Sequence, residues 1–178
     1  MNSEPEPTLI EFVLYNQWAN QQLLSICMKL DEELLAAKIP GTYGSILDTF
    51  RHLLRAEASF LQRVHGTAPR PAFNWDEVPS LAQLAVFADQ VAETFLETVQ
   101  NVVPTQNVHE ENDEWTFDYQ ARLIFMSLAY HGIAHRTDMT TFLTSKGLEM
   151  PELDIWAYQE AYPDRFQAKL AKKKASSD

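Results

Sequence analysis

The sequence is short of cysteine, basic residues and glycine. Its one cysteine, Cys27, excludes a disulfide within the chain. Lysine and arginine number 14 against 25 acidic residues, which gives a formal charge of −11. A domain with this charge repels the phosphate backbone, so we expect no nucleic-acid partner. There are only 5 glycines, and the nine prolines fall mostly between long stretches of regular apolar spacing.

Long hydrophobic runs are also lacking. A membrane-spanning helix needs roughly 20 apolar residues, and no run approaches that length. The stretch 123–134, for example, is interrupted by Ser127 and His131. Residues 1–7 are polar and acidic and do not resemble a signal peptide. We therefore expect no membrane partner and a cytoplasmic location.

The chain does contain apolar residues that repeat at helical spacing. Hydrophobic residues make up 46% and charged residues 22%, which is typical of a folded globular protein. The periodicity predicts an all-α fold, and Ser45 and Ser80 are suitable N-caps for two of its helices. Long helices are expected at 8–29, 45–66, 80–101 and 118–146, and short ones at 31–37 and 153–162.

The length of 178 residues fits one domain, which we place at 1–168. Residues 169–178 form a basic tail that we expect to be frayed. The stretch 102–118 is polar, with a few scattered apolar residues, and is compatible with either a loop or a small hairpin around 111–113. Four amphipathic helices in one domain predict a four-helix bundle with a long connection before the fourth. Such bundles build metal and ligand sites from inward-facing side chains.

Two histidines lie inside the apolar arc of the predicted 118–146 helix. His131 and His135 are four residues apart, so they stack on one helix face. A buried imidazole costs free energy unless its nitrogens find partners. A shared metal ion would supply a partner to both.

A third histidine lies just off the edge of the apolar stripe of the 45–66 helix. The neighbours of His52 on that helix are small, which leaves space beside the imidazole: Thr49, Ala56 and Ser59. Three histidines from two helices would leave a coordination position open, as in catalytic metal sites. The remaining histidines, His65 and His109, are expected to be structural or solvent-exposed.

Two carboxylates are candidates for a supporting role. Asp138 lies on the face of His131 and His135, where it could orient an imidazole or take a proton, and is the one weak catalytic candidate. It could equally be a solvated helix residue. Asp48 precedes His52 by one turn and invites the same interpretation. No Glu-x-x-His pair occurs, which disfavours a carboxylate-bridged di-iron site.

Other polar or reactive residues have simpler expected roles. Cys27 lies on a largely apolar helix without a basic neighbour and is expected in the core. Arg136 projects away from the histidine face and is expected to form an ion pair. Tyr15 and Trp18 are expected in the bundle core.

Four stretches together resemble the DinB/YfiT-like family of metal-dependent enzymes. They are YNQWAN at 15–20, GTYGSILDTFRHLLRAE at 41–57, HGIAHR at 131–136, and Pro151 with LDIWAY at 153–158. They occur in the expected order and span most of the chain. After the second histidine of the pair the family commonly continues Arg-Gly-Gln, whereas this chain has Arg136, Thr137 and Asp138.

The resemblance implies a bundle in which His52, His131 and His135 bind a divalent cation, often zinc or nickel. Characterised relatives include thiol-dependent S-transferases and a thiol-dependent isomerase, and other members are linked to stress or DNA-damage induction. It therefore implies a small-molecule substrate, a low-molecular-weight thiol as cosubstrate, and a homodimer.

These expectations leave several functions open. The cation could activate a thiol, giving a transferase, or water, giving a hydrolase. The alternative is a non-catalytic metal- or ligand-binding stress-response protein. A metal-free helical scaffold would require the histidines to find ordinary hydrogen-bond partners.

Overall fold

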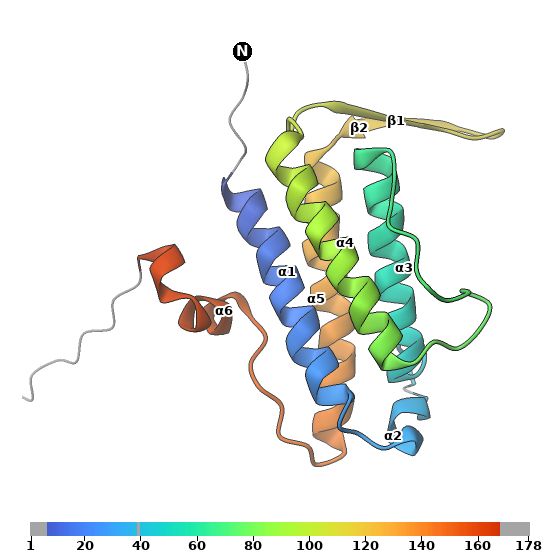
Figure 1. The fold of residues 1–178 in the computed structure, drawn as a ribbon, viewed down its shortest axis with the longest axis vertical. Coiled ribbons are helices and arrows are strands. Elements are labelled where there is room, and N and C mark those ends of the chain that lie inside the picture. Colours follow the sequence, from blue (N-terminus) through green and yellow to red (C-terminus); the bar gives the residue numbers. More distant parts are fainter. Residues whose placement is uncertain (1–6, 39, 168–178) are drawn as a thin grey trace, which may run out of the picture.

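The computed structural model describes residues 7–38 and 40–167. Four long helices form a bundle (Figure 1): α1 (Pro7–Cys27), α3 (Ile46–His65), α4 (Leu81–Asn101) and α5 (Arg122–Ser145). Both α1 and α3 pack against α4 and α5. Consequently α1 lies diagonally opposite α3, and α4 lies diagonally opposite α5. The predicted all-α bundle is confirmed.

The long connection before α5 contains a β-hairpin. Strands β1 (Asn107–Glu111) and β2 (Thr116–Gln120) pair antiparallel, with Val108 opposite Tyr119, and extend across one end of the bundle (Figure 1). The hairpin, and not a loop, is the correct alternative for this stretch. It also corrects the predicted start of the fourth helix at 118, because 116–120 are paired in a strand.

The helix ends follow local capping chemistry. Ser45 and Ser80 are N-caps, as predicted, and each forms a reciprocal capping box, with Asp48 and Gln83 respectively. Gly66 ends α3 in the left-handed conformation, with φ 86°. The helix predicted at 8–29 runs instead from Pro7 to Cys27, where the chain enters a turn.

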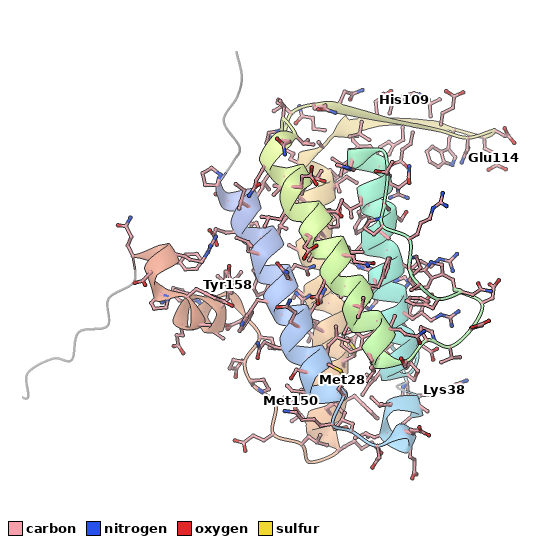
Figure 2. The ribbon with its side chains drawn as sticks, in the orientation of Figure 1. Met28, Lys38, His109, Glu114, Met150 and Tyr158 are labelled. Carbon is pink, nitrogen blue, oxygen red and sulfur yellow. The ribbon has the colours of Figure 1, made fainter. Side chains whose placement is uncertain are left out.

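Three short helical segments flank the bundle. The helices predicted at 31–37 and 153–162 are α2 (Glu32–Ala36) and α6 (Ile155–Ala161), and a 3-10 turn, η1 (Pro163–Phe166), follows. In Figure 2, Tyr158 lies where α6 meets α1. It is buried there with Tyr15 and Ala19. The Tyr15 hydroxyl donates to the Leu153 carbonyl at 2.8 Å, which ties the chain before α6 to the bundle.

The hydrophobic core fills the space between the four long helices. Its largest fully buried side chains are aromatic, from three of the helices: Phe50, Phe87, Phe95 and Phe125. Cys27 is 0% exposed and belongs to this core, as expected. Trp18 is only partly buried and packs on the Tyr15 cluster. The predicted tail, 169–178, lies outside the described residues, and none of the described helices is long and apolar enough to cross a membrane.

Candidate metal centre

Three histidines from two facing helices converge on one point. His131 and His135 are one turn apart on α5, and His52 comes from α3. The Nε2 atom of His131 lies 3.2 Å from that of His52 and 3.1 Å from that of His135. Potential ligand atoms of all three lie within 4.8 Å of one another. The structure thus brings together the three residues singled out in the sequence.

Aromatic rings hold two of these imidazoles in place. The ring of Tyr43 stacks on His52, with 3.7 Å between centroids and 19° between planes. Phe60 of α3 packs against the hydrophobic core, and the edge-on contact between its ring and that of His131 has 5.9 Å between centroids. Tyr43 lies between Gly41, with φ 82°, and Gly44, with φ 154°, which allow the sharp turns that place it there. Tyr43 was not identified as a site residue from the sequence.

The surroundings keep the three imidazoles neutral. Burial, followed by repulsion from His135, His52 and Arg136, lowers the pKa of His131 to about 4. Burial also lowers the pKa of His52 and that of His135. Near pH 7 each ring therefore has a lone pair available for a metal ion.

The donor set fits a divalent cation. Zinc–nitrogen bonds of about 2.0–2.1 Å in tetrahedral geometry place two nitrogens roughly 3.3 Å apart, close to the observed separations. The Nδ1 atoms of His131 and His135 are buried and have no hydrogen-bond partner among the described residues. The metal-free scaffold would require ordinary hydrogen-bond partners for both nitrogens of each ring, and these two Nδ1 atoms have none among the described residues. A cation at the Nε2 atoms would leave them without a partner as well.

Neither candidate carboxylate makes a hydrogen bond to a histidine of the cluster. Asp138 Oδ2 lies 3.9 Å from His135 Nδ1, which is too long for a hydrogen bond. Asp48 Oδ2 accepts instead from the backbone nitrogen of Ser45 at 3.2 Å and from its hydroxyl at 2.8 Å. Asp48 therefore caps α3 and, contrary to expectation, does not hydrogen-bond to His52.

A buried polar network lies between α1, α3 and α5. Arg136 is 2% exposed, and its Nη1 donates to Oδ1 of Asn16 and of Asn20, both at 2.7 Å. The two amides donate in turn to Glu57 Oε1, at 2.8 Å from Asn16 and 3.2 Å from Asn20. Arg136 therefore does not form the direct ion pair that was expected, because two amides lie between its guanidinium and the carboxylate.

Sequence reasoning overlooked three members of this network. Asn16, Asn20 and Glu57 lie within the family-like stretches, but a polar residue on a helix wheel does not reveal which neighbour it will face. Burial raises the pKa of Glu57, opposed by the amide hydrogen bonds and by the charge of Arg136. On α5, Arg136 faces the asparagines of α1, whereas His131 faces His52 of α3.

The other two histidines lie apart from the cluster, as expected. The Nδ1 atom of His65 is 3.0 Å from the Thr98 hydroxyl on α4. His109 lies on the hairpin (Figure 2), exposed, with its Nδ1 2.9 Å from Asp118. That hydrogen bond raises the pKa of His109.

Comparison with known proteins gives one result that bears on this geometry. The family model described as "DinB family" matches residues 1–168, which include all three histidines and the four-residue network. No curated protein matches the chain.

Proposed function

The chain belongs to the DinB family, and we propose that it is a metal-dependent enzyme acting on a small molecule. In this proposal His52, His131 and His135 hold a divalent cation, zinc or nickel. The observation that carries the proposal is the convergence of their three Nε2 atoms, with adjacent separations of 3.1 and 3.2 Å. Three neutral imidazoles meeting at one point are a typical donor set for such an ion.

An open coordination position favours catalysis over a purely structural role. Within the described residues the cluster comprises the three histidines and no fourth histidine, cysteine or carboxylate. Catalytic zinc sites have this composition, whereas structural sites are closed by a fourth protein ligand. A bound cation would supply Lewis acidity and lower the pKa of a thiol or water molecule.

The surrounding carboxylates favour a thiol over water as the activated group. A hydrolase would need a general base near the bound water. Asp48 is engaged in the α3 cap, and Glu57 accepts two amide hydrogen bonds in the buried network. Asp138 lies on the Nδ1 side of His135, away from the converging Nε2 atoms. We therefore propose a transferase that uses a low-molecular-weight thiol as cosubstrate.

Elemental analysis tests the metal site. Protein purified without a histidine tag should contain near-stoichiometric metal, and His52→Ala and His131→Ala should each lose most of it. Matched controls are His65→Ala and His109→Ala, which remove imidazoles outside the cluster. Equal metal contents in all five proteins, or no metal after incubation with zinc and nickel, would contradict the proposal.

A turnover assay then tests the reaction class. The metal-loaded protein should join a thiol to a small electrophile, and His131→Ala should abolish the reaction. Full turnover by His131→Ala would contradict this part of the proposal. Stoichiometric metal without turnover of thiols, electrophiles or esters would favour a non-catalytic binding protein.

A further inference from the structure

A cavity of about 390 Å³ adjoins the histidine cluster. Its lining consists of Tyr43 and four residues of α3: Asp48, Arg51, His52 and Arg55. His52 thus belongs both to the cluster and to the cavity wall, and Tyr43 stacks on its ring. A molecule held in this cavity would contact His52, the one histidine of the cluster that lines it.

The cavity concentrates positive charge in an acidic chain. Arg51 and Arg55 lie on either side of His52 in the sequence, on the same helix. Within the described residues neither guanidinium forms an ion pair with a carboxylate, and the carboxylate of Asp48 already accepts hydrogen bonds from Ser45. Two arginines therefore line the cavity, and neither is paired with an acidic side chain.

Trp75 contacts both arginines. An Arg51 Nη2 donates to the Trp75 carbonyl, and the Arg55 guanidinium carbon lies 6.0 Å from the centre of the indole ring. The indole is itself anchored, because it packs edge-on against Phe73 at 4.9 Å and Phe87 at 5.5 Å. Arginine groups that are held in advance lose less conformational entropy when they bind an anion.

We propose that this cavity binds the carboxylate of a small-molecule ligand whose other end reaches the three histidines. Arginine presents several donors in a planar fork that matches a carboxylate. The ligand class is then a short thiol or substrate that carries a carboxylate a few bonds from its reacting group. The link to the histidines rests on the proposed function, whereas carboxylate binding by the arginines does not.

Calorimetry with two thiols of equal chain length tests the proposal. In zinc-loaded protein, 3-mercaptopropionate should bind about fivefold more tightly than 3-mercapto-1-propanol, since partly exposed charge pairs contribute modestly. Arg55→Gln should remove this preference, and Arg55→Lys should retain part of it. Arg122→Gln is the matched control, because it removes the same charge from the exposed first residue of α5.

The metal content of each variant separates the two proposals. Arg55→Gln should keep its zinc, so a lost preference at full occupancy supports the anion site. Equal binding of the two thiols by the zinc-loaded parent protein, or equal effects of Arg55→Gln and Arg122→Gln, would overturn it.

A titration of the metal-free protein tests the anion site even if no metal binds. Succinate titrated into the metal-free protein should shift the side-chain Nε–H resonances of Arg51 and Arg55, while leaving those of Arg122 unchanged. The uncharged 1,4-butanediol should shift none of them. Unchanged Arg51 and Arg55 resonances would overturn the anion site, whatever the metal analysis gives.

Discussion

At Gly132 the interface between α5 and α1 leaves no room for a side chain. A Cβ at this position would lie 2.2 Å from Asn16 Oδ1 and 2.6 Å from Arg136 Nη1. These two atoms are hydrogen-bonded to each other in the buried network. Glycine here therefore allows the close approach of α1 that the network needs.

Replacing this glycine should destabilise the protein. Gly132→Ala is expected to cost about 2 kcal/mol, because forcing a methyl group into a packed interior displaces its neighbours. Helix propensity alone predicts the opposite, a gain of about 1 kcal/mol. Urea denaturation of Gly132→Ala measures the change.

The control for that experiment is Ala134→Gly, at an exposed position of the same helix. It should lose about 1 kcal/mol through propensity alone. A Gly132→Ala protein more stable than the parent would contradict the close approach seen in the structure.

The histidines were predictable individually because their spacing, and the apolar residues around them, fix their direction on a helix. His131 and His135 could be assigned to an inward face from the pattern of α5 alone. The partners of Arg136 could not, because they depend on which helix packs beside that face. Tyr43 likewise acts through a turn conformation that no periodicity describes.

At the scale of elements, the buried network joins three helices through four side chains. Removing its only cation should be costly, because the two buried amide oxygens would lose their donor and the buried Glu57 would lose the positive charge near it. Arg136→Leu is expected to lower the free energy of unfolding by about 3 kcal/mol. Chemical denaturation with circular dichroism measures it.

A surface pair provides the comparison. Arg165 and Glu11 form an ion pair at 2.7 Å with side chains 40% and 31% exposed. Arg165→Gln should cost less than about 1 kcal/mol, because solvent screens such pairs. If Arg136→Leu cost no more than this control, the network would not be holding the helices together.

Sequence patterns located the helices far better than the hairpin. Helix ends were marked by local chemistry, such as the capping boxes of Ser45 and Ser80. The two strands are mostly exposed, with only Val108 buried, and Glu110 and Tyr119 partly buried. They therefore lack the alternation of apolar and polar residues by which a strand is usually recognised.

At the scale of the whole molecule, the reactivity of the Cys27 thiol measures whether the protein is folded. It is 0% exposed, and burial raises the pKa of its thiol to about 12. In the folded protein at pH 8 the thiol should be both protonated and inaccessible, so it should not react with Ellman's reagent. Reaction should appear only as the protein unfolds in guanidinium chloride. Rapid, complete labelling of the folded protein would contradict the packing at the end of α1.

Metal binding should stabilise the whole fold, because the three proposed ligands come from two helices and are assembled only in the folded state. A cation present at 100-fold its dissociation constant should add about 2.7 kcal/mol. Denaturation with zinc and with a chelator measures the difference. His52→Ala should remove the difference, and a chelator effect that persisted in this variant would place the metal elsewhere.

The position of α4 has a practical consequence. It packs on α1 and α3, lies diagonally opposite α5, and supplies no residue to the histidine cluster, the arginine-lined cavity or the four-residue network. Its outward side is therefore the place to attach a dye or a surface anchor without disturbing the chemistry. Glu97 is exposed there, and because Cys27 is buried, Glu97→Cys would give a single reactive handle. The protein could thus be immobilised in one orientation, with its histidine cluster directed away from the support.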